Sequence, residues 1–425
     1  MTVGFEEIDG CLHVDNVSLK NIAKRFGTPS YVYSAANIKS QYDALSGAMQ
    51  RALPADKQPK LCFACKSNSN LAVLAYIHSL GASLEIVSEG ELKRGLKAGF
   101  DANQIVSTGV GKSDSEIESC LRAGIHQFNV ESLPELENIN NIAGKIGIKA
   151  TVVFRLNPSV SGGGHHKIST GRTRDKFGIS EDTLYDAYDI AHNMESVTPL
   201  GISVHIGSQV FKVESFKTAF EKMPSIVQNL RDKGHEVTRL DIGGGFPIIY
   251  QDEQLLDLDQ YAQWVRDIIL PLDVEIIMEP GRYLVGNAGV LLTQVTYVKE
   301  TSSRDFLIID AAMNDLIRPT LYEAYHGIEA VENRNAPQHT YDVVGPICET
   351  GDTFSTDRTL TQMKRGDLAI IQSAGAYGYC MASNYNTRGL PAEIFVKDGT
   401  AYEITPRQSV EDILAREIIP DEILK

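Results

Sequence analysis

The feature that most constrains the fold is a series of short apolar segments that alternate with amphipathic segments through residues 36–284. The apolar segments have the length of buried strands, and the segments between them have helical spacing. Capping-box patterns mark helix starts, with Ser88 before Glu91 and Ser132 before Glu135. About eight strand–helix units in series predict an α/β fold with a parallel (β/α)8 barrel, and they disfavour a doubly wound sheet. The predicted barrel strands are residues 61–65, 83–87, 105–108, 126–130, 151–156, 201–206, 238–242 and 275–278.

The pattern changes after the barrel segment, where strand-like runs follow one another with few long helical segments. This pattern predicts a β-rich domain, sandwich-like or barrel-like, over residues 285–425. Near the start of the chain, residues 19–26 have one apolar helical face, and residues 31–33 form a strand pattern. We expect residues 1–35 to pack with the second domain, so that the barrel is an insertion. The predicted strands of this domain are residues 290–298, 306–310, 341–344, 367–372 and 393–396.

Composition limits the classes of function. The 425 residues are 43% hydrophobic, which is enough to build a large core. The formal net charge of −15 disfavours non-specific binding to nucleic acid or to anionic membranes. The first residues have neither a basic n-region nor an apolar h-region, and no apolar run has the length of a bilayer span. We therefore expect a cytoplasmic protein with neither a nucleic-acid nor a membrane partner.

The cysteines give no sign of a metal site. The chain has six of them, scattered over its length, which is typical of reduced thiols rather than of a disulfide framework. Cys62 and Cys65 form a C-x-x-C pattern, but their segment has the composition of a buried strand and no second pair follows at zinc spacing. The sequence therefore predicts no bound metal.

A lysine ends the first predicted barrel strand. Lys66 follows Cys65 and precedes Ser67 and Asn68. Barrel enzymes place their reactive groups where strands run into the following loops. A lysine at the tip of a buried strand is partly desolvated, which favours the neutral, nucleophilic amine that reacts with an aldehyde. Position alone is equally compatible with a surface lysine in a loop.

Other polar groups recur at the ends of later strands. His205 ends one strand, residues 243–245 are three consecutive glycines after the next, and Glu279 and Arg282 follow the last. Taken singly, these features fit a core histidine, an ordinary turn and a salt-bridged turn. Together with the lysine they provide a nucleophile, a stacking ring, a glycine loop for a phosphate and a carboxylate for a ring nitrogen. Those are the groups needed to hold pyridoxal 5′-phosphate (PLP).

From Phe26 to about Arg388 the sequence resembles the fold-type III PLP-dependent decarboxylases, and within them the diaminopimelate decarboxylase family. The resemblance implies that Lys66 carries PLP, that His205 stacks on its ring and that Glu279 pairs with its pyridine nitrogen. The cofactor-binding residues that it implies are Lys66, Glu85, His205, Ser208, Gly243, Gly244, Gly245, Glu279, Gly281, Arg282 and Tyr377.

Motifs in the second domain narrow the resemblance. The loop that contains Cys348 resembles the family's cysteine loop, which reaches into the active site of the neighbouring subunit. Glu349 follows this cysteine, where relatives that act on ornithine usually have aspartate. The resemblance implies Lys66, His205 and Cys348 as catalytic residues, and a homodimer with shared active sites. The substrate-binding residues that it implies are Arg282, Arg318, Tyr322, Glu349 and Tyr377.

Two further segments match the loop after the fifth barrel strand, residues 165–171 and 176–179. The sequence departs from the family in two places. Glu85 stands where the family often has aspartate, and residues 161–164 are unusually rich in glycine. The second departure suggests a looser active-site loop.

The resemblance implies the conversion of meso-2,6-diaminopimelate to L-lysine and carbon dioxide, the last step of lysine biosynthesis. In this reaction Glu279 keeps the ring nitrogen protonated, so that the cofactor accepts electrons. Cys348 is the expected proton donor to the α-carbon. Arginine suits the distal carboxylate of the substrate, because it binds carboxylates in a bidentate manner, and Glu349 suits the distal ammonium.

Three alternatives remain open from the sequence. The first is a decarboxylase of ornithine, arginine or a carboxylated polyamine, whose substrate offers Arg318 no distal carboxylate. The second is a racemase of the same fold, but such enzymes usually place arginine rather than Glu279 at the ring nitrogen. The third is a non-catalytic PLP carrier, which the presence of Lys66, Cys348 and a β-rich domain disfavours.

Overall fold

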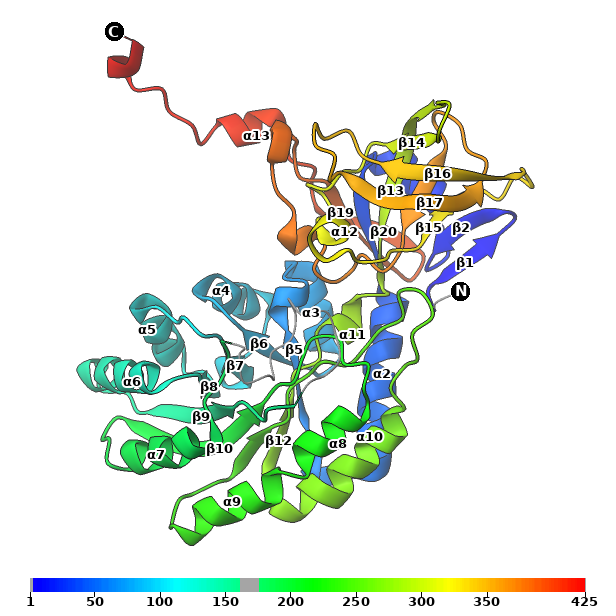
Figure 1. Ribbon diagram of the computed structural model, residues 1–425. Helices are drawn as coiled ribbons and strands as arrows, with labels where there is room; N and C mark the ends of the chain where they lie inside the picture. The colour runs from blue at the N-terminus through cyan, green and yellow to red at the C-terminus, as the bar shows by residue number, and fades with distance from the viewer. Residues whose placement is uncertain (1–2, 161–175, 425) are drawn as a thin grey trace. The chain divides into compact units, whose positions relative to one another are not determined.

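A computed structural model describes residues 3–160 and 176–424 (Figure 1). The chain forms two compact units, one of Ile38–Leu284 and one of Met1–Asn37 with Val285–Lys425. The motif segment at residues 165–171 and the glycines at 162–164 lie outside the described residues. Over the described ranges, we find no helix that combines the length and the apolar character needed to cross a membrane.

The first unit is a closed barrel of eight parallel strands, which confirms the predicted fold (Figure 1). The strands follow one another around the barrel in chain order, and the last pairs with the first through Ile277 opposite Lys60 and Met278 opposite Leu61. The barrel strands are β5 (Lys60–Ala64), β6 (Ser83–Ile86), β7 (Ile105–Ser107), β8 (Gln127–Val130), β9 (Ala150–Leu156), β10 (Val197–Val204), β11 (Arg239–Asp241) and β12 (Glu275–Met278).

One barrel strand is longer than expected. β10 begins at Val197, before the predicted start at Gly201, and it contains Pro199. Proline has no N–H to give to a ladder, so it argues against a central strand. The register shifts between Pro199 and Gly201, and this bulge allows the strand to contain the proline.

Helices alternate with the barrel strands, and α4 to α7 lie outside β6 to β9 (Figure 1). Ser88 and Ser132 cap their helices as predicted, each accepting a hydrogen bond from the residue three positions later. The Glu91 carboxylate accepts its hydrogen bond from the N–H of Val87 rather than Ser88, so the capping box is only half formed. The helices of this unit are α2 (Ala35–Ala52), α3 (Leu71–Ser79), α4 (Glu89–Ala98), α5 (Asp114–Ala123), α6 (Leu133–Ile146), α7 (Glu181–His192), α8 (Glu214–Phe220), α9 (Met223–Asp232), α10 (Leu258–Trp264) and α11 (Arg282–Val285).

The second unit is β-rich, as predicted. Its larger sheet has the strand order β17-β16-β14-β13-β4-β19-β20; off this path, β18 pairs with β13, and β15 pairs with β18. A smaller sheet contains β1 to β3. The elements are β1 (Phe5–Ile8), β2 (Cys11–Val14), β3 (Val17–Ser18), α1 (Leu19–Phe26), β4 (Ser30–Ser34), β13 (Gly289–Lys299), β14 (Phe306–Ile309), α12 (Arg318–Tyr322), β15 (Ile328–Ala330), β16 (Gln338–Val344), β17 (Thr353–Thr361), β18 (Leu368–Ile371), β19 (Ala392–Lys397), β20 (Thr400–Thr405) and α13 (Val410–Leu414).

The start of the chain supplies part of this sheet. β4 pairs with β13 on one side and with β19 on the other. Leu19 and Ile22 of α1 pack into the same apolar cluster as Val32 of β4 and Ile394 of β19. The sequence did not indicate β17 or β20, because both lie at sheet edges and are mostly polar or partly exposed.

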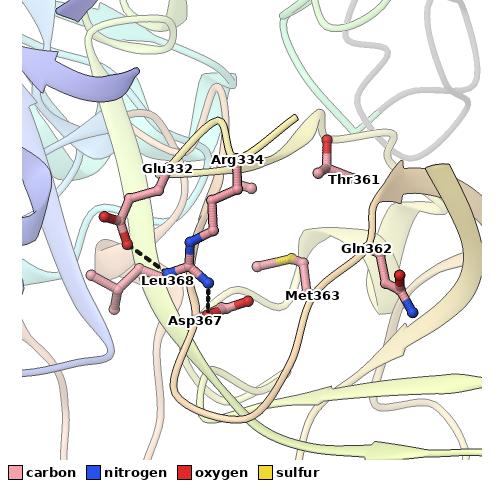
Figure 2. A pocket seen from close by; sticks show the side chains of 8 residues that line it. Glu332, Arg334, Thr361, Gln362, Met363, Asp367 and Leu368 are labelled. Carbon is pink, nitrogen blue, oxygen red and sulfur yellow. Dashed lines mark hydrogen bonds and ion pairs between the residues drawn. The ribbon is translucent and has the colours of Figure 1, made fainter. Parts of the chain in front are cut away.

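A small pocket in the larger sheet is lined by a mixture of apolar, polar and charged side chains, the charged ones being Glu332, Arg334 and Asp367 (Figure 2). There Arg334 bridges Glu332 at 2.7 Å and Asp367 at 2.5 Å. Because these groups already satisfy one another and the arginine is partly exposed, we interpret the pocket as a surface ion-pair network rather than a ligand site.

Candidate active site

The candidate lysine is presented by a short turn at the carboxyl end of β5. Residues Cys65–Ser67 form one turn of 3₁₀ helix directly after the strand. The turn is held by Asn68, whose N–H donates to the Cys65 carbonyl at 3.0 Å, and by Ser67, whose hydroxyl donates to the Ala64 carbonyl at 2.7 Å. Lys66 therefore leaves the strand end from a fixed backbone position.

Lys66 forms an ion pair with Glu85 of β6. Its Nζ lies 2.5 Å from Glu85 Oε2, and the glutamate side chain has no exposed surface. The pair places a carboxylate oxygen directly beside the lysine amine. The other oxygen, Glu85 Oε1, is buried and has no hydrogen-bond partner in the described part of the chain. A buried, unpaired oxygen is costly, so this position suits a polar group of a bound molecule.

Two more carboxyl groups are fully or nearly buried beside this pair. Asp241 ends β11 and Glu279 follows β12. The Asn129 amide Nδ2 donates to Asp241 Oδ2 at 2.9 Å and to Glu279 Oε1 at 3.3 Å, and the Thr108 hydroxyl donates to the same Glu279 oxygen at 3.2 Å. Burial, and next the negative charge of Asp241, raises the pKa of Glu279 well above its usual value. Burial also raises the pKa of Asp241.

Sequence reasoning did not identify Asn129 or Thr108. Both lie near the carboxyl ends of barrel strands, and both side chains are buried. The sequence offered one sign of such residues. A polar residue within an otherwise apolar strand, as in Phe128-Asn129-Val130, needs a polar partner when it is buried.

His205 follows β10 and is a neutral imidazole at physiological pH. Burial, and then the charges of Arg155 and Lys66, lower its pKa well below the usual value. Its Nδ1 accepts a hydrogen bond from the N–H of Gly244 at 3.1 Å, so the proton of the neutral ring is on Nε2. An uncharged ring at this position can stack on another flat ring.

The glycines at 243–245 allow the strand ends to approach closely. Gly243 has a φ of +70°, and a Cβ on it would lie 2.3 Å from the Val204 carbonyl oxygen. A Cβ on Gly244 would lie 2.0 Å from the Glu279 carbonyl oxygen. The N–H of Gly243 donates to Asp241 Oδ1 at 2.9 Å. Two of the N–H groups expected to face an anion are thus used in holding Asp241 and His205, and the glycines also serve backbone packing.

Ser208, in the loop after β10, and Arg282, the first residue of α11, come together. The buried Arg282 donates from Nη2 to the Ser208 hydroxyl at 3.1 Å and from Nη1 to the Tyr250 hydroxyl at 2.6 Å. A guanidinium with two hydroxyl groups is a combination that suits a phosphate. Gly281 precedes this arginine, and a Cβ on it would lie 2.9 Å from the Ala64 side chain.

A buried ion pair at the end of β9 also escaped sequence reasoning. Arg155 Nη1 lies 2.7 Å from Glu131 Oε1, and the N–H of Gly178 donates to Glu131 Oε2 at 2.8 Å. The Arg155 guanidinium also lies 4.8 Å from the centre of the Phe177 ring. These contacts fix the segment that matched the family at residues 176–179. Sequence reasoning could have found this pair, because Arg155 is a charged residue inside the strand predicted over residues 151–156.

The remaining candidates belong to the β-rich unit and form two groups. In α12, the buried Arg318 donates to His326 Nε2 at 3.4 Å and lies 5.6 Å from the centre of the Tyr322 ring. Tyr377 follows β18 with a φ of +55°.

The loop between β16 and β17 contains the other group. Cys348 is exposed, and the adjacent Glu349 accepts a hydrogen bond from the Tyr385 hydroxyl at 2.8 Å. Asp352 shapes this loop by accepting hydrogen bonds from the N–H groups of Ile347 at 2.7 Å and Met313 at 2.6 Å.

The barrel groups define a class of protein. A lysine paired to a buried glutamate, a neutral histidine, a buried carboxyl group and an arginine–serine pair converge from the carboxyl ends of barrel strands. These residues fit the aldehyde, ring face, ring nitrogen and phosphate of PLP. In the described ranges, no three His, Cys, Asp or Glu side chains are grouped so as to hold a metal ion.

Comparison with known proteins gives the particular family. A family model described as the pyridoxal binding domain of pyridoxal-dependent decarboxylases matches residues 36–286. The chain is 45% identical to a diaminopimelate decarboxylase from Pseudomonas aeruginosa over 97% of this chain and 98% of that protein. It is 41% identical to one from Aquifex aeolicus, covering 96% and 95%. The chain belongs to the diaminopimelate decarboxylase family, and its cofactor is PLP.

Solved structures agree with this family. Diaminopimelate decarboxylase from M. jannaschii in co-complex with L-lysine superposes with a TM-score of 0.94 at 35% identity, covering 99% of this chain and 100% of that one. The Helicobacter pylori structure complexed with L-lysine gives 0.88 at 37% identity, covering 93% and 98%. The fold class, family and cofactor predicted from the sequence are thereby confirmed, and the alternative of a decarboxylase for ornithine, arginine or a carboxylated polyamine is not favoured.

Proposed function

We propose that this chain decarboxylates meso-2,6-diaminopimelate to L-lysine and carbon dioxide, the last step of lysine biosynthesis. The observation that carries the proposal is the 45% identity to a diaminopimelate decarboxylase over 97% of the chain. L-lysine, the product of this reaction, is the ligand named in two of the similar structures.

We assign cofactor binding to the barrel domain, residues 36–284, with residues 1–35 and 285–425 as the second domain. Lys66 binds the cofactor aldehyde covalently. Its ammonium must first lose a proton, and Glu85 Oε2, at 2.5 Å, is an acceptor within reach. When bound, PLP supplies a sink for the electrons left on the α-carbon after the carboxylate departs.

The other barrel residues hold the cofactor in place. Glu279 pairs with the ring nitrogen, and neutral His205 stacks on the ring. Ser208 and Arg282, joined at 3.1 Å, bind the phosphate together with the glycine loop at residues 243–245. The loop also holds His205 in place, because the Gly244 N–H donates to the imidazole at 3.1 Å.

The β-rich domain provides the distal end of the substrate site. Arg318, Tyr322 and Tyr377 bind the distal carboxylate together with Arg282, and Glu349 binds the distal ammonium. A buried arginine such as Arg318, only 5% exposed, suits a carboxylate that is withdrawn from water.

We propose a homodimer with shared active sites. Cys348 of each chain donates a proton to the α-carbon in the site of the other chain. Support comes from its exposure on a loop that Asp352 braces with two backbone hydrogen bonds. We further propose that the enzyme acts in the cytoplasm, since its six cysteines are scattered over the chain, which is typical of reduced thiols rather than of a disulfide framework.

The test is a substrate panel with release of carbon dioxide as the readout. Meso-diaminopimelate, L-lysine and L-ornithine are compared by kcat/KM, and Lys66→Ala serves as the inactive control. We expect meso-diaminopimelate to be preferred by roughly 10⁴-fold, because a site built for a polar group leaves buried charges unpaired when that group is missing. Comparable values for ornithine would move the chain to the broader group of decarboxylases.

A further inference from the structure

The cofactor requires one carboxylate at its ring nitrogen, yet the barrel brings two carboxyl groups to the same place. Asp241 has no exposed surface, and Glu279 is 7% exposed. The same amide nitrogen of Asn129 donates to both, at 2.9 Å and 3.3 Å. Two carboxylates this close and this far from water cannot both ionise without a large cost, so one proton is retained between them.

Asp241 contacts two parts of the candidate cofactor site. Its Oδ1 accepts the hydrogen bond from the N–H of Gly243 at 2.9 Å, which holds the start of the glycine loop. Its Oδ2 is joined through Asn129 to Glu279, and the Thr108 hydroxyl holds Glu279 from the other side at 3.2 Å. One side chain therefore connects the loop after β11 with the carboxyl group after β12.

We propose that Asp241 is a positioning residue that exchanges a proton with Glu279. When Glu279 meets a protonated ring nitrogen, it gives its proton to Asp241 and becomes the carboxylate of the pair, while Asp241 becomes the neutral acid. The total number of protons and the net charge of the pair do not change. This inference rests on the role proposed above for Glu279, and it adds the residue that determines when Glu279 is ionised.

The surroundings of the pair favour a single retained proton. Besides the pair itself, the groups that act on its titration are Glu85 from β6, Lys66 after β5, the buried Cys62 thiol of β5 and the Tyr261 hydroxyl of α10. Burial is the main cause that raises the pKa of both carboxyl groups, and the negative charge of Glu85 acts in the same direction. Burial also raises the pKa values of Cys62 and Tyr261, so both stay neutral at physiological pH.

The experiment follows the ring nitrogen rather than catalysis. Holoenzyme is reduced with borohydride, which converts the imine linkage into a saturated amine that is no longer conjugated with the ring. The absorbance and fluorescence of the attached ring are then titrated between about pH 5 and pH 9. The variants are Asp241→Asn and Asn129→Ala. The amide that Asp241→Asn introduces keeps an oxygen that can accept from the Gly243 N–H, so the glycine loop retains its anchor.

The two variants should move the midpoint of the spectral change in opposite directions. Asp241→Asn removes the second carboxyl group that shares the negative charge, so Glu279 should ionise more easily, the ring nitrogen should hold its proton more tightly and the midpoint should rise by about one pH unit. Asn129→Ala removes a donor that stabilises the ionised pair, so the ring nitrogen should lose its proton more readily and the midpoint should fall. Glu275→Gln, at the other end of β12 and about 13 Å away, is the matched control and should leave the midpoint unchanged.

The outcomes of the two variants decide whether Asp241 exchanges a proton with Glu279. An unchanged midpoint in Asp241→Asn, with only a lower cofactor content or melting temperature, would show that Asp241 is merely structural and would overturn the proposal. Movement of both variants in the same direction would also overturn it. If Asp241→Asn fails to fold, the fall of the midpoint in Asn129→Ala still tests the proton exchange. No substrate is present, so a failure of the diaminopimelate assignment leaves this measurement intact.

Discussion

The amino ends of the barrel strands carry a charged cluster that has no part in the proposed reaction. Glu275, at the start of β12, lies 3.2 Å from Lys60, 3.1 Å from His126 and 3.1 Å from Arg239. The hydrogen bond from His126 is the main cause that holds the Glu275 pKa at about 2, against the opposing effect of burial. We predict that Glu275→Gln destabilises the barrel at neutral pH.

The expected loss of folding free energy in Glu275→Gln follows from the pKa of Glu275. For a fully buried group, a pKa of about 2 in place of the usual 4.5 corresponds to about 3 kcal/mol of folding free energy. Because 36% of the Glu275 side chain is exposed, solvent screening reduces the expected loss to about 1–2 kcal/mol. A carboxyl group whose folded pKa is depressed stabilises the protein above its unfolded pKa. The contribution is therefore fully present at neutral pH, and it is lost as the pH falls from about 4.5 toward 2.

The assay is urea unfolding of wild type and Glu275→Gln at several pH values from about 7 down to 3.5. The difference in unfolding free energy should be constant near neutral pH and should narrow at the acidic end, because the protonated glutamic acid resembles glutamine. Asp273→Asn is the matched control: its exposed ion pair with Lys57, at 2.6 Å, should contribute nothing measurable. No loss at neutral pH, or a loss that does not depend on pH, would refute the reasoning.

Three further predictions concern the proposed site. Borohydride reduction and peptide mapping should find the pyridoxyl label on Lys66, and a label on any other lysine would disprove that assignment. Lys66→Ala and Cys348→Ala chains, each nearly inactive alone, should regain activity in verified heterodimers, because one complete site forms; no recovery would argue against shared sites. Arg318→Met should remove most of the preference for diaminopimelate in kcat/KM while the cofactor spectrum stays unchanged, and a changed spectrum would place the residue near the cofactor.

Local sequence patterns determined the barrel and much of the candidate site. Strand and helix periodicities and capping residues act over a few positions, so each of the eight barrel strands could be placed to within a few residues. The carboxyl ends of parallel strands meet at one end of a barrel, so residues at those ends could be expected to gather there. That rule alone indicated Lys66, His205 and Glu279 as candidate site residues.

Tertiary structure alone decided which of these groups touch. Asn129 meets Asp241 and Glu279 from 112 and 150 positions away, because closure of the barrel brings β8, β11 and β12 around one axis. The pairing of Lys66 with Glu85 likewise depends on two neighbouring strand ends. Periodicity fixes which face a side chain occupies, but the partner across the barrel depends on strand register, and so the hydrogen bonds and pKa values of the site followed only from the closed fold.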